Sequence, residues 1–411
     1  MNEKKLSIQS SIMWNSIGSI FYLGCQWLIT VIVVWISGLE DAGMLTLAMS
    51  VSNIWYSVAV YGMRNYQVSD TQNTFAADSY FLSRIVTSAI AFAGCGIYIF
   101  IIAYDPVQKI CIILYFIYKL SEAFFDVYAG VYQKEWRLDY AGKSMMIRGV
   151  LTISSFVVVL KCTGSMALTF VCMAVTCILS LLCYDIPRVN RLCSMRFTSE
   201  KKKVFTLLKI CFPLLVYTLL SSAIGTIPRL YLERMLGAYK LGIYGSVATP
   251  TLIIQMGATY IFNPFVTVFA ERYARKEKEK FLSVFWKCMG TVGLIAVAAV
   301  IVSELLGHWG LQLLYGESVA AHVELLTPLV ICTILTAFAW FLCGVLTVTR
   351  DFKGLVLGNL SAVIVAAVSS WSLIQRWDMQ GASVALGLAT ITEIIILCAF
   401  LYKSVKKQFS L

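Results

Sequence analysis

The chain has 411 residues, of which 59% are hydrophobic and 13% are charged. Soluble globular domains carry about 25% charged residues, so this composition excludes an ordinary soluble protein and indicates an integral membrane protein with many spans. The formal net charge is +11, which would suggest nucleic-acid binding in a soluble protein. We expect no nucleic-acid partner, because in a membrane protein the distribution of Lys and Arg among the loops is what carries information.

A helix that crosses the bilayer needs about 20 mainly apolar residues. Twelve segments meet this requirement, at 12–36, 44–65, 82–104, 107–132, 146–161, 165–184, 208–234, 239–263, 281–303, 325–348, 354–375 and 380–402. With connections this short, only helices can satisfy their backbone hydrogen bonds inside lipid. The predicted fold class is therefore all-α: a polytopic membrane protein with about twelve transmembrane helices in two six-helix lobes around a central cavity.

A basic stretch separates the sixth segment from the seventh and is the predicted boundary between the lobes. We expect an N-terminal six-helix lobe over 1–190, a basic cytoplasmic connection over 191–207 and a C-terminal six-helix lobe over 208–411. Two parallel repeats with the substrate site between them are a common transporter plan.

A weak internal sequence repeat supports this division. Gly38 and Gly43 flank the turn between the first two segments, and Gly237 and Gly242 recur at the same spacing between the seventh and eighth. The alternative is that glycines simply favour turns in both places.

Lysines and arginines are distributed asymmetrically between the two sides. With the N-terminus in the cytoplasm, the inner side receives Lys4, Lys5, Arg64, Arg84, Lys134, Arg137, Lys143, Arg148, Arg188, Arg191, Arg196, Lys201 to Lys203, Arg272, Arg275, Lys276, Lys278, Lys280, Arg350, Lys353, Lys403, Lys406 and Lys407. The outer connections receive few. We therefore expect both termini in the cytoplasm, with the first apolar segment retained as a helix because no cleavage site follows it.

Three charged residues lie in the middle of the fourth segment. Lys119, Glu122 and Asp126 are spaced so that they share one stripe of a helix. A Lys or Asp at the centre of a membrane helix costs roughly 3 kcal/mol, so such residues face water or one another rather than lipid. We take this stripe as the centre of the predicted substrate site.

Each charge in the stripe has two interpretations. Lys119 either contacts the substrate at mid-membrane or forms a structural ion pair with Glu122 or a neighbouring helix. Glu122 and Asp126 either carry a coupling ion, a proton or sodium, or act as counter-ions, which is the interpretation we favour. Glu393 stands alone in the last segment and is a further coupling candidate.

Arg229 is the second candidate for substrate binding. It precedes the turn after the seventh segment by eight residues, which places it about 12 Å inside the end of a regular helix. Pro213, Gly225 and Pro228 favour a kink or hinge in that helix. The alternatives are an Arg229 that extends its charge outward to the interface, or one that pairs with Glu233.

Two further groups complete the predicted site. Arg64 and Arg84 flank a loop with Asp70 and Asp78, and they either form the inner mouth or anchor to lipid headgroups and loop acids. Polar side chains in the first two segments suit sugar hydroxyls or helix–helix hydrogen bonds equally well. These polar residues are Asn15, Gln26, Asn53, Tyr56 and Tyr61.

Enzyme and metal chemistry find little support in the sequence. The 13 cysteines are scattered without a Cys-x-x-Cys motif, and the two histidines lack partners at ligand spacing, so we expect no metal or cofactor besides a coupling ion. There is no Gly-x-Ser-x-Gly motif and no phosphate loop. No loop exceeds about 20 residues, which disfavours a membrane glycan polymerase. We predict a transporter, not an enzyme.

Three stretches resemble a known family. They are Tyr61-Gly-Met-Arg-Asn-Tyr-Gln-Val-Ser-Asp70 followed by Tyr80-x-x-x-Arg84, the preceding turn Gly-Leu-Glu-Asp-Ala-Gly, and Tyr132-Gln-Lys-Glu-Trp-Arg-Leu-Asp-Tyr-Ala-Gly-Lys143. They resemble the polysaccharide flippases, the O-antigen and teichoic-acid repeat-unit exporters of the multidrug/oligosaccharidyl-lipid/polysaccharide (MOP) superfamily. The match covers roughly residues 10–150, and the second half agrees in span count alone.

The resemblance implies a flippase of a bacterial cell membrane. It would move an undecaprenyl-diphosphate-linked glycan from the inner to the outer leaflet by alternating access, for cell-surface polysaccharide export, alongside other polysaccharide-assembly proteins. The alternative is a multidrug or organic-cation antiporter of the same superfamily. An anion flippase needs basic cavity walls and a cation exporter acidic ones; by count, Lys119 and Arg229 against the acids Glu122, Asp126 and Glu393 leave this undecided.

Overall fold

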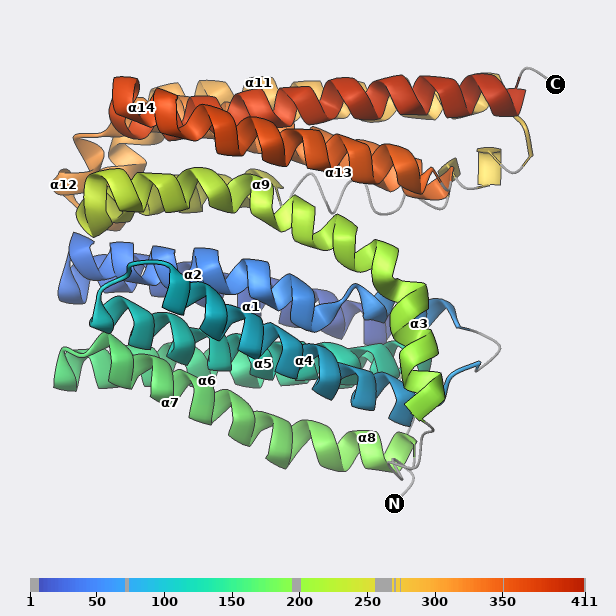
Figure 1. Ribbon diagram of the computed structural model, residues 1–411, viewed down its shortest axis with the longest axis horizontal. Helices are drawn as coiled ribbons and strands as arrows, with labels where there is room; N and C mark the ends of the chain where they lie inside the picture. Colours follow the sequence, from blue (N-terminus) through green and yellow to red (C-terminus); the bar gives the residue numbers. More distant parts are fainter. Residues whose placement is uncertain are drawn as a thin grey trace. The chain divides into compact units, whose positions relative to one another are not determined.

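The computed structural model describes residues 7–70, 74–193, 201–255, 268–269, 271–273, 275–349 and 351–409. Within these ranges the regular elements are helices and no strand is present (Figure 1). Each of the twelve predicted segments overlaps a helix, although the second is interrupted near its end and the end of the eighth lies outside the described ranges. The chain thus has the all-α fold of a multi-pass membrane protein, as predicted.

Nine helices in the described ranges are long and apolar enough to cross a membrane by length and composition. Two of them are merged helices that each contain two of the predicted segments. The helix at Pro106–Lys134 is not among the nine, although its 29 residues are long enough to cross. It carries the charged stripe in its middle.

The chain divides into two compact units, Met1–Leu219 and Leu220–Leu411. In unit 1, α1 packs on α6, α2 packs on α4 and α5, and α7 packs on α5 and α6. The elements before the unit boundary are α1 (Ile8–Ser37), α2 (Leu39–Val60), α3 (Met63–Ser69), α4 (Ala77–Ile101), α5 (Pro106–Lys134), α6 (Leu138–Thr163), α7 (Met166–Ser180), the π-helical segment η1 (Leu181–Asp185) and α8 (Ile186–Leu192).

The helix α9 (Lys201–Ala248) begins in unit 1 and continues into unit 2. The predicted basic connection falls partly on 194–200, which lie outside the described residues. In unit 2, α13 packs on α11 and α14. The remaining elements are η2 (Thr249–Thr251), α11 (Lys278–Tyr315), α12 (Glu317–Ala320), η3 (Val323–Leu325), α13 (Leu326–Val348) and α14 (Phe352–Phe409).

Glycines make the turns that the sequence analysis singled out. Gly38 lies between α1 and α2 with φ 87° and ψ −173°, and Gly237 interrupts α9 with φ 82° and ψ 174°. This left-handed φ favours glycine, which has no Cβ. The two turns therefore match in conformation as well as spacing, but Gly316 has nearly the same angles between α11 and α12, so the conformation marks a turn type and not by itself a repeat.

The second predicted segment is not one continuous helix, which corrects the expectation for 44–65. α2 ends at Val60, and Tyr61 and Gly62 both have left-handed φ angles, of 58° and 62°. A Cβ added at Gly62 would lie 2.9 Å from Cβ of Leu214. The break thus depends on a glycine that both adopts the conformation and leaves room for α9.

Helices α1 and α6 approach closely at a pair of glycines. A Cβ on Gly18 would lie 2.2 Å from the carbonyl oxygen of Gly142, and a Cβ on Gly142 would lie 2.1 Å from the carbonyl oxygen of Trp14. Small residues allow backbones to approach in this way inside a membrane, where packing drives helix association. The pair fixes α1 against α6, and therefore fixes the polar side chains of α1 relative to those on α6.

Candidate functional site

The charged stripe on α5 divides into two groups. Lys119 forms an ion pair with Glu122 one turn further along the helix. Asp126 instead pairs with arginines from the α2–α4 region. The ion-pair interpretation of Lys119 is therefore realised in this structure, while its contact with a substrate phosphate stays a prediction.

Aromatic hydroxyls and rings surround the first group. The Tyr118 hydroxyl donates to Oε1 of Glu122 at 2.8 Å, and the hydroxyls of Tyr22 and Tyr118 lie 2.8 Å apart. Nζ of Lys119 lies 4.7 Å from the ring centroid of Tyr56, a distance at which a cation is attracted to the ring. One polar chain thus links α1, α2 and α5 around an ammonium group.

The second group centres on Asp126. Arg84 donates from Nη2 to Oδ2 of Asp126 at 2.9 Å and from Nη1 to the carbonyl of Ala59. Nη1 of Arg64 lies 3.6 Å from the other carboxylate oxygen of Asp126, and its Nη2 donates to Gln133 at 3.2 Å. Two guanidinium groups therefore share one carboxylate, which leaves one positive charge uncompensated.

The two arginines differ in access to solvent. The side chain of Arg84 is 0% exposed, whereas that of Arg64 is 34% exposed. Both were expected either at the inner mouth or anchored to lipid headgroups and loop acids. In this structure Arg84 is enclosed and ties α4 to α2 and α5, and Arg64 is the member of the pair that reaches the surface of unit 1.

Arg148 was counted among the charges of the inner side and was not predicted as a site residue. It lies inside α6 and is 1% exposed. Its Nη2 donates to the carbonyls of Ser121 and Cys177 at 3.3 and 3.4 Å, and its guanidinium lies 4.7 Å from the ring centroid of Phe125. Nε has no acceptor, and within the described residues no carboxylate lies at ion-pair distance. Its place inside the predicted segment 146–161 was the sequence signal that we missed.

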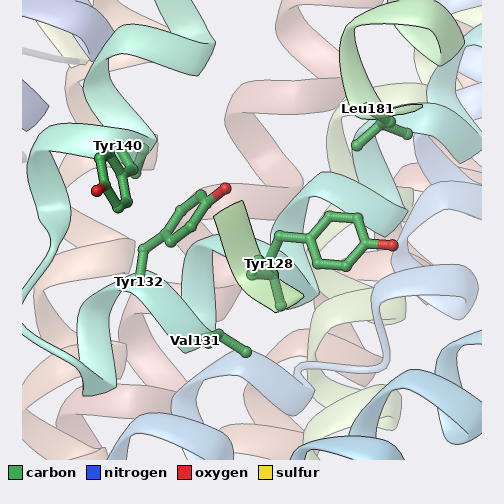
Figure 2. Packing of buried hydrophobic residues seen from close by; sticks show 7 residues of the cluster. Tyr128, Val131, Tyr132, Tyr140 and Leu181 are labelled. Atoms are coloured by element: carbon green, nitrogen blue, oxygen red, sulfur yellow. The ribbon is translucent and has the colours of Figure 1, made fainter. Parts of the chain in front are cut away.

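Asp185 was also missed by the sequence analysis. It ends η1, is 0% exposed, and accepts hydrogen bonds from the hydroxyls of Tyr132 at 3.1 Å and Ser144 at 2.9 Å. Figure 2 shows the Tyr132 ring in a buried cluster with the rings of Tyr128 and Tyr140. No sequence pattern predicts a π-helical segment, although such segments are frequent at functional sites.

Unit 2 holds the other two predicted charges. Within the described part of unit 2, Arg229 on α9 has no hydrogen-bond or ion-pair partner, so the predicted alternative of a pair with Glu233 is not formed. Tyr244 is the titratable group in electrostatic range of Arg229. Glu393 on α14 is 4% exposed, and Sγ of Cys343 lies 3.8 Å from its Oε1.

The predicted sugar-binding residues lie in unit 1. Oδ1 of Asn15 and Nε2 of Gln26 are covered and have no hydrogen-bond partner in the described residues. Gln26 also lies beside the hydroxyl of Tyr118. Tyr61 packs against an apolar cluster that includes Met63. Contact of these residues with sugar hydroxyls stays a prediction.

Comparison with known proteins gives consistent results. No protein-family model matches the chain. It is 22% identical over 380 residues to the capsular polysaccharide biosynthesis protein CapF of Staphylococcus aureus, covering 92% of this chain and 94% of that one.

Solved structures with the same fold are transporters. The MATE multidrug transporter DinF-BH matches with a TM-score of 0.70 at 15% identity, covering 98% of this chain and 96% of that one. An inward-facing MATE transporter of the MOP superfamily matches with a TM-score of 0.64 at 13% identity, covering 99% and 97%. A MOP superfamily transporter from Pyrococcus furiosus, described as having a binding pocket of reversed polarity, matches with a TM-score of 0.58 at 14% identity, covering 97% of each chain.

The chain therefore has the fold of the MOP superfamily transporters, as its resemblance to the polysaccharide flippases predicts. Within the described residues, no group of three or more His, Cys, Asp or Glu side chains is arranged to hold a metal ion.

Proposed function

We propose that this protein is a flippase that moves a lipid-diphosphate-linked oligosaccharide from the inner to the outer leaflet by alternating access, for cell-surface polysaccharide export. The observation that carries the proposal is the pairing of its intramembrane charges. Counting residues left undecided whether the predicted site is positive or negative, and the ion pairs support a positive one.

The pairing leaves positive charge. Lys119 and Glu122 neutralise each other, and Arg64 and Arg84 share the single carboxylate of Asp126. Arg229 has no counter-ion within the described part of unit 2. Glu393 is enclosed. An excess of guanidinium groups suits a diphosphate, which arginine binds through two parallel hydrogen bonds, and it repels an organic cation.

The similarity to a capsular polysaccharide biosynthesis protein over most of both chains supports a glycan-related cargo. We infer an undecaprenyl-diphosphate-linked glycan as the substrate, other polysaccharide-assembly proteins as partners, and a bacterial cell membrane as the location. Unpaired polar atoms at Asn15 and Gln26 supply hydrogen-bonding capacity for sugar hydroxyls.

We infer an orientation with both termini in the cytoplasm from the Lys and Arg asymmetry. Single cysteines at Glu40 and Gln312, in a background without the native cysteines, should react with an impermeant reagent from outside. A cysteine at Lys278 should react only after permeabilisation. All three positions are exposed, so access depends on the side of the membrane. Reaction at position 278 in intact cells would reverse the orientation.

We also infer that an ion gradient, of protons or sodium, drives transport. Glu122, Asp126 and Glu393 are the candidate carriers. Of these, Glu393 contacts a thiol and has no cationic partner in the described residues, whereas the other two take part in ion pairs. A carboxylate without a counter-ion in a membrane interior gains most from binding a cation or a proton.

A multidrug antiporter is the second candidate function, because solved structures with this fold are multidrug transporters. The two functions differ in their dependence on Lys119 and Arg229. Substitution of either cation by Ala should reduce glycolipid export in a complementation assay and leave membrane abundance near normal, because neither cation forms an ion pair with another helix in the described residues.

The matched control is Arg275→Ala, which removes an arginine that is 61% exposed and should leave export unchanged. Full export by both Lys119→Ala and Arg229→Ala would overturn the proposed site. Organic-cation resistance conferred by the unmodified chain, together with no movement of a fluorescent lipid diphosphate in vesicles, would favour the antiporter.

A further inference from the structure

Arg148 is an unexplained charge in unit 1. It is 1% exposed, it donates two long hydrogen bonds to backbone carbonyls, and its Nε has no acceptor. An enclosed guanidinium without a carboxylate partner is unfavourable, because carbonyl dipoles replace little of the hydration that is lost.

Two carboxylates lie in electrostatic range of Arg148 and neither forms an ion pair with it in the described residues. Asp185 already accepts a hydrogen bond on each oxygen, from Tyr132 and from Ser144. Glu122 is held by Tyr118 and by Lys119, whose side chain is 17% exposed. Glu122 is therefore the carboxylate that is paired with a cation, and that cation, Lys119, is accessible to a ligand.

The position of Arg148 next to Glu122 is well defined. Its Nη2 donates to the carbonyl oxygen of Ser121, the residue that precedes Glu122 on α5. Ser121 and Glu122 are consecutive on α5, so this hydrogen bond holds the guanidinium close to the residue whose carboxylate Lys119 pairs with.

We propose that Arg148 is the second counter-ion of Glu122, and that a substrate phosphate, by taking Lys119, transfers Glu122 from Lys119 to Arg148. This rests on the proposed function and deepens it. Before binding, Lys119 and Glu122 are paired and Arg148 is not. After binding, the phosphate pairs with Lys119 and Glu122 pairs with Arg148, so every charge has a partner. Arg148 acts through Glu122 and is a positioning residue.

The exchange alters which helices are joined. The pair between Lys119 and Glu122 lies within α5, whereas a pair between Glu122 and Arg148 joins α5 to α6. Phosphate binding thereby converts an ion pair inside one helix into a tie between two helices. The ion pairs of unit 1 therefore join different helices in the phosphate-bound state and in the state without phosphate.

The test is a mutant cycle on binding of farnesyl diphosphate to the purified full chain, with farnesol as the control ligand that lacks phosphate. Arg148→Met should weaken farnesyl diphosphate binding by about tenfold or more, because Glu122 then keeps Lys119. Glu122→Gln alone should tighten binding. The double variant Arg148→Met with Glu122→Gln should bind at least as well as the unmodified chain. Farnesol binding should not change in any variant.

Arg148→Lys preserves the charge and should retain most of the binding, which guards against a loss caused by misfolding of Arg148→Met. Weakening by Arg148→Met that Glu122→Gln does not rescue, or weaker binding by Glu122→Gln alone, would overturn the exchange and leave the flippase proposal intact. Failure of the unmodified chain to bind farnesyl diphosphate more tightly than farnesol would overturn the proposed function itself.

Discussion

The two units use charge in opposite ways. In unit 1 the buried ionic side chains are tied to neighbouring helices: Arg84 to Asp126 and Asp185 to Tyr132 and Ser144. In unit 2 the two candidate charges, Arg229 and Glu393, take part in no ion pair within its described residues. Its core is instead built from small residues, as where Ala362, Ala366 and Ala389 pack with Ile224.

This difference separates the roles of the charges. A buried charge that is part of a network contributes to folding, so its removal is destabilising whatever else it does. A charge outside any network contributes little to folding, and its cost is tolerated for another reason. Substitutions in the network of Arg84 and Asp126 should therefore report mainly on stability, and those at the two charges of unit 2 mainly on transport.

The largest expected effect is loss of the enclosed arginine in unit 1. Arg84→Met leaves Asp126 with one partially exposed partner and leaves the carbonyl of Ala59 with the Thr87 hydroxyl alone as donor, which should lower the free energy of unfolding by about 3–5 kcal/mol. Arg64→Met is the matched control on the same carboxylate and should cost about 1 kcal/mol or less. Thermal unfolding of the purified variants measures both, and equal losses would contradict the network interpretation.

The next effect tests packing in unit 1 without changing charge. Gly142→Ala places a Cβ against the Trp14 carbonyl and should cost about 1–3 kcal/mol, because backbone cannot move aside as a side chain can. Gly24→Ala on α1 is the control, since no atom lies within 4 Å of the added Cβ. Membrane abundance and melting temperature should fall for the first variant only; similar values for both would show that α1 and α6 do not need this close contact.

The corresponding change in unit 2 should have a small effect on folding. Glu393→Gln keeps the shape of the side chain and its contact with Cys343, and no cation loses a partner. We expect a change in unfolding free energy within about 1 kcal/mol, unaltered farnesyl diphosphate binding, and loss of gradient-driven movement of lipid diphosphate in vesicles. A strong loss of abundance instead would place Glu393 in the same class as the charges of unit 1.

The smallest effect concerns a loop carboxylate outside the membrane. Burial opposes ionisation of Asp70, but hydrogen bonds from the backbone N–H groups of Phe75 and Thr74 and from the Tyr80 hydroxyl outweigh it and lower the pKa of Asp70. A pKa lower in the folded than in the unfolded state adds stability above about pH 4, and this is lost as the pH falls through the folded value.

Asp70→Asn should therefore flatten the decline in melting temperature between about pH 5 and pH 3. Asp78→Asn, in the first turn of α4, is the control in the same loop. An unchanged acid profile for Asp70→Asn would show that the hydrogen bonds around this carboxylate do not stabilise the fold.

The fold was largely predictable because hydropathy over a span is a local property. The twelve segments follow from apolar runs, and the spacing of Lys119 and Glu122 on one helix predicts the pair that the structure contains. Partners from other helices were not predictable in this way. Nothing in the local sequence connects Arg84 with Asp126, or Ser144 with Asp185, since these contacts depend on how the helices pack.

Arg148 shows how an error in a helix boundary can hide a site residue. The fifth segment was predicted to begin at residue 146, which puts Arg148 at its end, whereas α6 begins at Leu138 and contains Arg148 ten residues further on. An arginine inside an otherwise apolar segment is a candidate site residue for the same reason as the charges of the stripe on α5.

The start of α9 completes the core of unit 1. Leu207 and Cys211 are 0% exposed and pack in one cluster with Met63, Tyr80 and Val127. Cleavage in the basic stretch before α9 would thus remove Leu207 and Cys211 from the buried cluster of the first fragment. In the second fragment these apolar side chains would be exposed. Two polypeptides divided there should be unstable apart and recover only when produced together, so the halves are interdependent for assembly however independently each one moves in transport.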